Sequence, residues 1–324
     1  MDIDLRVLKQ VEREFEIPFS ESITIIEAAI LAAYHKIVGN NDPARAELNR
    51  TTGHVAVYAP VLDEDGVQTG ETEVTPENFG RIAANAGKQV IASRIRALND
   101  DTIFGEFQGK EGDIVSGTIQ QGSKSYMVYV DLGTIEAIMP PEEQVPGEDY
   151  SHGRRIRVYV TSVSRGTRGP QVTVSRTHPS LVRKLFALEV PEIASGVVEI
   201  VSLAREAGHR TKIAVRATQP GVNAKGSCIG ELGQRVRAVT SELNDEKIDI
   251  VDYSDDLPAF VASALSPARV SSAFTLDAAA RSVRVLVPDF QLSLAIGKEG
   301  QNARLAAKLT GAKIDIQPDS ILED

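Results

Sequence analysis

The stretch Cys228-Ile-Gly-Glu-Leu-Gly-Gln-Arg-Val-Arg237 decides the fold of the second half of the chain, because it occurs twice. Its second copy is Ala295-Ile-Gly-Lys-Glu-Gly-Gln-Asn-Ala-Arg304, which repeats the isoleucine, both glycines, the glutamine and the last arginine at an offset of 67 residues. Lys247-Ile-Asp-Ile250 and Lys313-Ile-Asp-Ile316 follow the two copies at an offset of 66. A period this long in only two copies indicates duplicated small domains, not a solenoid.

Each copy has the same order of expected elements: a helix, two strands, a helix, the G-x-x-G, a second helix and a strand. Around the first copy the pattern predicts a helix near Leu181–Leu188 and strands at Val197–Leu203 and Lys212–Arg216. Around the second it predicts a helix near Ala259–Leu265 and strands at Val270–Thr275 and Val283–Val287. This order resembles the prokaryotic type of KH domain, an RNA-binding fold.

A G-x-x-G between two helices lets a sugar-phosphate backbone approach the loop, because glycine has no Cβ. The next helix points free N–H groups and its positive dipole end at the same place. KH domains clamp about four nucleotides with this loop. Lys298 gives the second loop a partner for a phosphate, whereas Glu231 gives the first loop the wrong sign of charge.

The alternative for each loop is a tight structural turn, with Ile229 and Ile296 in the core rather than in an RNA groove. Two matched copies favour RNA binding. We expect arginines on the following helices to compensate for Glu231. The candidate RNA-binding residues of the two copies are Gly230, Glu231, Leu232, Gly233, Arg235, Arg237, Gly297, Lys298, Glu299, Gly300, Gln301, Asn302 and Arg304.

Residues 109–178 predict short strands separated by glycine-rich turns. These strands are Ile114–Ile119, Tyr126–Leu132, Glu136–Met139, Arg155–Val163 and Gln171–Ser175. Five strands without a helix between them predict a small closed barrel. The phrases Glu111-Gly-Asp-Ile-Val115, Tyr129-Val-Asp-Leu-Gly133, Glu136-Ala-Ile-Met-Pro140 and Val172-Thr-Val-Ser-Arg176 resemble, in this order, the OB-fold RNA-binding domain first described as repeats in a ribosomal protein.

Tyr126, Tyr129 and Arg155 are the candidate RNA ligands of the barrel. Aromatic rings stack on bases with about 1–3 kcal/mol each. At odd spacing in one strand the two tyrosines would point to opposite sides, so we expect one of them at most to bind RNA. Arg155 lies in a basic cluster with Arg154 and Arg157, for which a solvated strand face is the alternative.

Residues 1–108 predict a helix at Ser22–Val38 and a hairpin of Ala44–Leu48 with His54–Pro60. A second helix is expected from an N-cap at Thr75 to Leu98, followed by a polar junction at Asn99–Thr102. This segment holds 10 Lys and Arg against 18 Asp and Glu, a net charge of −8 out of −10 for the whole chain. An acidic head on a nearly neutral body suggests that the head contacts a basic protein surface.

The sequence contains no recognisable catalytic motif. The five histidines stand apart without metal-ligand spacing, and Cys228 precedes a loop glycine where a core residue is expected. A P-loop is absent, and so is any apolar run of the roughly 18 to 20 residues that a membrane span needs. We therefore expect no catalytic residue, no metal, no cofactor and no membrane contact. An acidic start and a lone cysteine predict a cytoplasmic protein.

The whole order resembles the NusA family of bacterial transcription factors. The resemblance rests on Thr177-His-Pro-Ser-Leu-Val-Arg-Lys-Leu-Phe-Ala-Leu-Glu-Val-Pro-Glu192 and on Pro288-Asp-Phe-Gln-Leu-Ser-Leu-Ala-Ile-Gly-Lys298. It implies an α+β multidomain protein: an RNA polymerase-binding α/β domain at residues 1–104, an OB-type barrel at 105–178, and two tandem KH domains at 179–254 and 255–324. The junction Asp252–Pro258 is short, so one continuous RNA path over both KH domains is expected.

The partners that this family implies are the RNA polymerase core near its RNA exit channel, nascent single-stranded RNA and other antitermination factors, with the protein acting as a monomer. Two other classes carry similar modules. An RNA-degrading phosphorolytic enzyme would place them after two large catalytic domains, for which residues 1–108 are too few. The other is a ribosome- or GTPase-linked KH protein, against which the absence of a P-loop and the presence of two KH copies argue.

Overall fold

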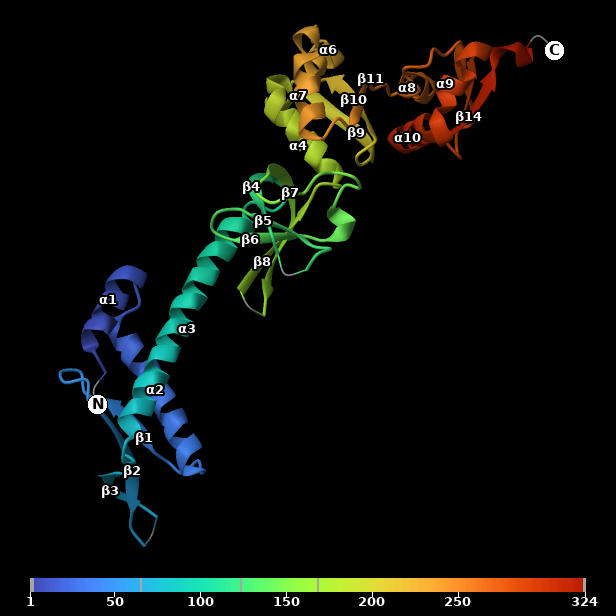
Figure 1. Cartoon of the computed structure of the whole chain (residues 1–324). Helices are drawn as coiled ribbons and strands as arrows, with labels where there is room; N and C mark the ends of the chain where they lie inside the picture. The colour runs from blue at the N-terminus through green and yellow to red at the C-terminus, as the bar shows by residue number, and fades with distance from the viewer. Residues whose placement is uncertain (1–2, 65, 123, 168, 323–324) are drawn as a thin grey trace. The chain divides into compact units, whose positions relative to one another are not determined.

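The computed structural model describes residues 3–64, 66–122, 124–167 and 169–322. Contacts divide the chain into two compact units, residues 1–105 with 167–170, and residues 106–166 with 171–324 (Figure 1). The first unit has a hydrophobic core of its own, and the second contains two such cores. Each unit thus has the apolar interior that an independently folding domain needs.

The first unit packs helices on a small antiparallel sheet of order β1-β2-β3. Its elements are α1 (Leu5–Phe15), α2 (Phe19–Val38), β1 (Arg45–Leu48), β2 (Val55–Leu62), β3 (Gln68–Glu73) and α3 (Phe79–Gln108). Ile23, Ile26 and Ile30 give α2 a buried stripe, and Gly39 at φ +79° ends this helix as predicted. The hairpin is confirmed, whereas α1 and β3 were not predicted.

Helix α3 corrects two expectations. It begins at Phe79, because the hydroxyl of Thr75 accepts a hydrogen bond from the Val57 amide (2.9 Å) and so belongs to the sheet, not to a helix cap. It also runs through Asn99–Thr102, the expected junction, to Gln108. The apolar spacing continues through this segment to the buried Phe107, so the polar residues are only one face of the helix. The boundary predicted after residue 104 lies inside α3.

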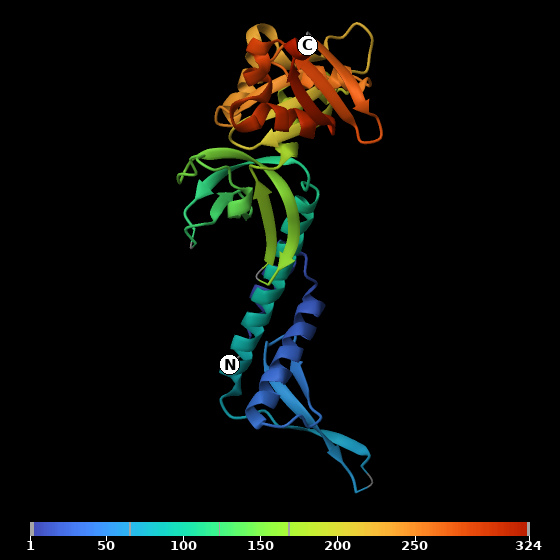
Figure 2. The same cartoon turned by 90° about the vertical axis from the view of Figure 1, so that its right-hand side faces the viewer.

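The predicted five-stranded barrel is confirmed, with the closed order β4-β5-β6-β8-β7. Its strands are β4 (Ile114–Gln120), β5 (Val128–Asp131), β6 (Glu136–Met139), β7 (Arg155–Gly166) and β8 (Gly169–Ser175), and the neighbouring β7 and β8 are conspicuous in Figure 2. Strand β5 starts two residues later than Tyr126, which lies in a turn. The argument that Tyr126 and Tyr129 alternate along one strand is therefore wrong.

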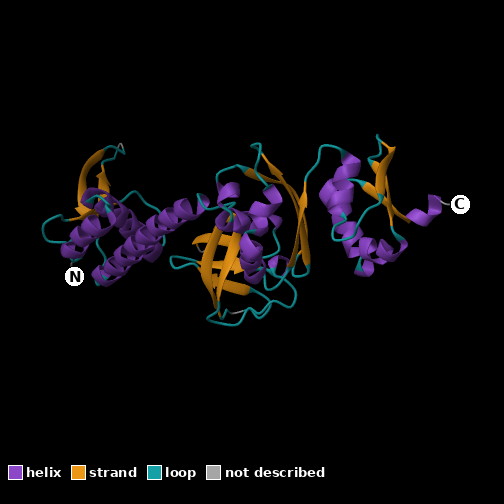
Figure 3. Cartoon of the chain, turned by 90° about the horizontal axis from the view of Figure 1, so that it is seen from above, coloured by secondary structure: helices purple, strands orange, loops and turns teal. Residues whose placement is uncertain are grey.

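Both repeats fold as predicted, each with helices against a three-stranded mixed sheet (Figure 3). The first contains α4 (Pro179–Glu189), α5 (Pro191–Ala194), β9 (Val198–Glu206), β10 (Arg210–Ala217), α6 (Ala224–Ile229), α7 (Gln234–Glu242) and β11 (Lys247–Asp252). The second contains α8 (Leu257–Ala264), β12 (Ser272–Asp277), β13 (Ser282–Val287), α9 (Leu292–Ile296), α10 (Gln301–Thr310) and β14 (Lys313–Pro318).

The two repeats share a hydrophobic core. Helices α8 and α10 of the second repeat pack on their own sheet and also against β9, β10 and β11 of the first. Ala204, Ala214 and Val251 from the first repeat join the core of the second. The buried ammonium of Lys212 adds a polar tie, since it donates to the carbonyl of Ser266 (2.7 Å). A layer of helices thus lies between two sheets.

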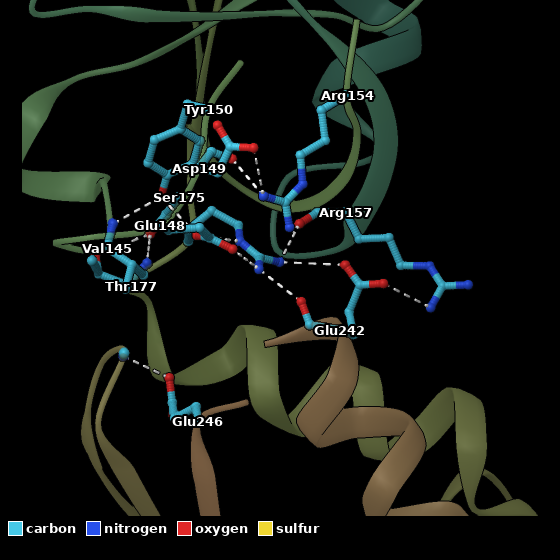
Figure 4. Close-up of polar contacts among 12 residues, drawn as sticks. Val145, Glu148, Asp149, Tyr150, Arg154, Arg157, Ser175, Thr177, Glu242 and Glu246 are labelled. Atoms are coloured by element: carbon cyan, nitrogen blue, oxygen red, sulfur yellow. Dashed lines mark hydrogen bonds and ion pairs between the residues drawn. The ribbon is translucent and has the colours of Figure 1, made fainter. Parts of the chain in front are cut away.

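A buried arginine, Arg176, ties the barrel to the first repeat. Its partners Glu148, Arg157 and Glu242 are labelled in Figure 4. Arg176 forms an ion pair with the buried Glu148, and it donates to the carbonyl oxygens of Arg157 (2.9 Å) and Glu242 (2.8 Å). Tyr150 donates a further hydrogen bond to Glu148 (2.7 Å). Burial raises the pKa of the Tyr150 hydroxyl, so this donor keeps its proton. Arg157 and Arg176 also form ion pairs with the carboxylate of Glu242 (3.4 Å each), so paired charges hold the barrel to the last turn of α7.

Candidate nucleic-acid interface

The two G-x-x-G loops have the same backbone. Gly230 and Gly297, the first glycines, lie at φ +74° and +78° with ψ of 173° and 170°. The second glycines, Gly233 and Gly300, lie at φ +76° and +73°. In each loop the residue between them, Leu232 or Glu299, also adopts a left-handed conformation, at φ 51° and 53°. Duplicated sequence has thus given duplicated local structure.

The two glycines of a loop meet different surroundings. A Cβ on Gly230 would lie 2.6 Å from Cγ of Arg235, and a Cβ on Gly297 would lie 2.8 Å from Cβ of Asn302. Each first glycine is therefore packed on the helix that follows it. A Cβ on Gly300 would meet nothing within 4 Å. The second glycine leaves open the space that a ligand backbone would need.

Helices α7 and α10 start at these second glycines without a side-chain N-cap. Because a helix leaves its first N–H groups without intrahelical partners, each loop ends in uncapped donors and a positive dipole end. Lys298 and Glu299 are exposed in the second loop, as are Glu231 and Leu232 in the first. The second loop alone presents a cation beside its donors.

Arg235, expected at phosphates, is committed elsewhere. Its guanidinium donates to Glu192 (2.8 Å) and to the carbonyl of Ser227 (2.8 Å). The equivalent residue of the second copy, Asn302, is buried and donates to the carbonyl of Ala295 (3.0 Å). Both side chains therefore support the loop through hydrogen bonds to other protein groups.

Gln301 and Arg304 reach across to the first repeat. Arg304 forms an ion pair with Glu206 at the end of β9 (2.7 Å), and Gln301 donates to the same carboxylate (2.9 Å). The bond from Arg304 holds the pKa of Glu206 below its usual range. The contacts of Arg304 and Gln301 with Glu206 therefore anchor the start of α10 to the first repeat. Arg237 is exposed on α7.

In the barrel, Tyr126 is exposed and the ammonium of Lys124 lies 5.9 Å from its ring centre. Tyr129 is half-buried, and its ring occupies the space next to Gly122, where a Cβ would lie 1.9 Å away. Arg155 is exposed at the start of β7. The sequence analysis did not predict Lys124 as an RNA ligand, although it stands two residues before the candidate Tyr126.

Cys228 is buried in the core of the first repeat, and burial raises the pKa of its thiol to about 11. This confirms the prediction of a core residue and leaves the thiol protonated. In the described part of the chain no three His, Cys, Asp or Glu residues are grouped to hold a metal ion. Over the same residues, no helix is long and apolar enough to cross a membrane.

A small barrel followed by two KH folds with matching loops defines a modular RNA-binding protein. Family models match four successive segments: NusA N-terminal domain at residues 5–75, S1 RNA binding domain at 109–175, NusA-like first KH domain at 176–253 and NusA-like second KH domain at 257–324. The chain belongs to the NusA family of transcription termination/antitermination proteins.

Similar relatives are proteins named transcription termination/antitermination protein NusA. The one from Mycobacterium tuberculosis is 55% identical over 99% of this chain and 94% of its own length. That from Bacillus subtilis is 46% identical over 98% and 91%, and that from Thermus thermophilus is 43% identical over 82% and 70%. The predicted family and its multidomain α+β fold are confirmed.

Proposed function

We propose that this chain holds nascent single-stranded RNA on its barrel and KH loops while its acidic head docks on the RNA polymerase core, and that it thereby modulates pausing, termination and antitermination without catalysis. The observation that carries the proposal is the matched pair of loops, each with an open second glycine and an uncapped helix start. Membership of the NusA family supports the role in transcription.

Within this proposal, RNA phosphates lie at Gly230–Gly233 and at Gly297–Gly300, and Lys298 pairs with one of them. Arg237 and Tyr126 are exposed and suit direct RNA contact, as does Arg155. Arg235, Asn302, Gln301 and Arg304 act by holding the loops in place, since each of them donates hydrogen bonds to other protein groups. Tyr129 supports the barrel surface from within.

The head is assigned to polymerase because of its charge. Its net charge is −8, against 0 for residues 109–178 and 0 for residues 179–254. Negative charge repels RNA but suits a basic protein surface. Because polymerase works on the chromosome in the cytoplasm, the proposal places the protein there, as a monomer that other antitermination factors join.

The test replaces the two variable residues of each loop with aspartate. Lys298→Asp with Glu299→Asp removes a cation and adds negative charge, whereas Glu231→Asp with Leu232→Asp adds charge to a loop that is already acidic. The glycines remain, and aspartate tolerates the left-handed conformation of the second variable residue. The second-loop variant should lose several-fold to about a hundredfold in RNA affinity, the scale of a lost charge-assisted contact. The first-loop variant should lose less.

Fluorescence anisotropy with a ten-nucleotide RNA measures both affinities over a range of salt concentrations. The second-loop variant should show a flatter salt dependence, because one phosphate contact is gone. Lys298→Asn with Glu299→Asn is the neutral control of similar shape and should lie between the parent and the aspartate variant. All variants should melt within a few degrees of the parent and still bind purified polymerase. Unchanged affinity and salt slope would show that Gly297–Gly300 is only a structural turn.

A further inference from the structure

The two repeats differ in the side chains that lie next to the G-x-x-G loop. In the first repeat a shallow hollow is lined by six residues of the α6–loop–α7 segment: Asn223, Gly226, Ser227, Gly230, Glu231 and Gln234. Glu192 and Arg235, which form an ion pair, complete its lining. The hollow of the first repeat is therefore polar, and it adjoins the first loop directly.

The repeat offset of 67 residues places a different chemistry at the same positions of the second repeat. The equivalents of the six residues are Phe290, Ser293, Leu294, Gly297, Lys298 and Gln301. Both loops have the same backbone, so these residues precede or follow the second loop at the same sequence distances as the six residues of the first repeat. Phe290 and Leu294 thus replace Asn223 and Ser227, and Lys298 replaces Glu231.

Phe290 is presented to solvent by a fixed turn. Its side chain is 80% exposed, and that of Leu294, four residues later, is 44% exposed. Asp289 accepts a hydrogen bond from the Ser320 hydroxyl (2.9 Å), and the side chain of Gln291 accepts one from the Arg269 amide (3.2 Å). Both neighbours of Phe290 are therefore anchored, while its ring stays outside the core.

We propose that Phe290 is a base-stacking platform for RNA that the second loop clamps. The proposal rests on the RNA-binding function assigned above to Gly297–Gly300. Seven residues separate Phe290, in the 3-10 turn before α9, from Gly297 after it; at a rise of about 1.5–2 Å per residue this is about 10–14 Å. That span is within the reach of the roughly four nucleotides that a KH loop holds. RNA whose phosphate pairs with Lys298 passes over Leu294 and places one further base on the ring.

Stacking suits this position because every base has a π-face, so an aromatic ring binds RNA without selecting a sequence. The surface is continuous with the loop and its cation, which suits a polyanion. The exposed apolar side chains of this segment, Phe290, Leu294 and Ile296, are far smaller than the roughly 800 Å² per partner of a stable protein interface. The asymmetry also assigns the repeats different roles: the second adds a base contact, and the first does not.

The test compares Phe290→Ala with the parent, using fluorescence anisotropy and a ten-nucleotide RNA. Loss of one stacked base should weaken binding by about five- to fiftyfold, from the alanine-substitution scale of such contacts. Phe290→Trp should bind as tightly as the parent. Because the chain contains no tryptophan, this variant has a single indole, and saturating RNA should quench its emission.

Phe274→Ala is the matched control. Phe274 is 41% exposed in the same repeat, but it lies opposite Arg284 on the sheet, whereas the neighbouring Val283 and Val285 face the helices and core. Its removal should leave RNA affinity unchanged. The melting temperature of Phe290→Ala should also be unchanged, because the ring is outside the core.

Equal RNA affinity of Phe290→Ala and the parent overturns the stacking proposal, as does unquenched emission of the Phe290→Trp variant at saturating RNA. Weaker binding of Phe290→Ala than of the parent to purified polymerase without RNA assigns the surface to a protein instead and overturns it too. If Lys298→Asp with Glu299→Asp weakens binding and Phe290→Ala does not, the loop function stands and only the platform fails. If neither change has any effect, the loop function fails as well.

Discussion

The four loop glycines have two different tasks. Gly230 and Gly297 combine a positive φ with ψ near 170°, a region open almost only to glycine, and each packs on its own following helix. Gly233 and Gly300 adopt the ordinary left-handed conformation, where a Cβ would meet only Cγ1 of Val236 at 4.0 Å in the first loop and nothing within 4 Å in the second. The first glycine therefore shapes the loop, and the second keeps its outer surface accessible.

This division predicts a ranking of alanine substitutions. Gly230→Ala and Gly297→Ala should each cost about 2–4 kcal/mol of unfolding free energy, because backbone strain adds to a close contact. Gly233→Ala and Gly300→Ala should cost about 1 kcal/mol, the strain of a left-handed residue alone. Urea unfolding followed by circular dichroism measures the difference. Equal losses at the two positions of one loop would contradict the packing role of the first glycine.

For single residues, the sequence predicted the G-x-x-G loops but not the tertiary hydrogen bonds of the side chains that hold these loops. A G-x-x-G and a neighbouring lysine are visible in a few letters. The commitment of Arg235 to Glu192, 43 residues away in the chain, depends on tertiary structure. The same holds for Asn302, whose amide reaches the carbonyl of Leu265 (3.0 Å) from inside the core. Residue type alone assigned both to RNA.

At the scale of secondary-structure elements, one buried carboxylate in the first repeat connects β9, β10 and the turn between them. Glu246, just before β11, accepts hydrogen bonds from Arg205 on β9 (2.9 Å), from the amide of Gly208 (2.8 Å) and from Thr211 on β10. Burial alone would raise the pKa of Glu246, but these hydrogen bonds and the charge of Arg205 outweigh it and lower that pKa. The folded state therefore favours the ionised form.

The sign of the pH dependence follows. Because the folded pKa is depressed, the stabilisation is complete above the unfolded pKa of about 4.3 and is lost as pH falls through the folded value. Glu246→Gln should cost about 3–5 kcal/mol at pH 7, since it leaves Arg205 buried without its partner. The difference in free energy of unfolding between Glu246→Gln and the parent, measured by urea unfolding, should shrink between pH 5 and 3. The exposed change Glu231→Gln should show no such gap, and a pH-independent gap for Glu246→Gln would refute the assignment.

Elements with strong periodicity were predicted correctly, but the residues at which some of them begin and end were not. The barrel strands and both repeats appear in the expected order, since alternating or helical apolar spacing is local information. The start of α3 was wrong because Thr75 bonds to Val57, a contact 18 residues away. The strand predicted at Tyr126 starts at Val128, because no local signal separates a turn tyrosine from a strand tyrosine.

For the whole molecule, the shared core of the two repeats fixes the distance between their loops. The sequence showed that the junction is short, but it did not show that α8 and α10 are covered by sheets on both sides. The small residues Ala204 and Ala214, which make the close approach possible, look like ordinary strand residues in the sequence. Two loops on domains that share one core need not be brought together when RNA binds.

RNA length should therefore affect affinity steeply. Each KH loop holds about four nucleotides. A five-nucleotide RNA reaches one loop, whereas a ten-nucleotide RNA reaches both, and the second contact then forms at a high effective concentration. We expect at least a tenfold gain in affinity by fluorescence anisotropy. The Lys298→Asp with Glu299→Asp variant should lose most of this gain. Equal affinity for both lengths would argue against one continuous path.

The position of α10 has a mechanical consequence. This helix starts at the second loop and lies in the layer between two sheets, so a pull on RNA held at Gly297–Gly300 is directed into the middle of the structure. Separating one repeat from the other would have to expose the shared core, in which Ala204, Ala214 and Val251 of the first repeat pack against the second. Under tension from a moving transcript, we expect the RNA to slip from the loops before the repeats separate.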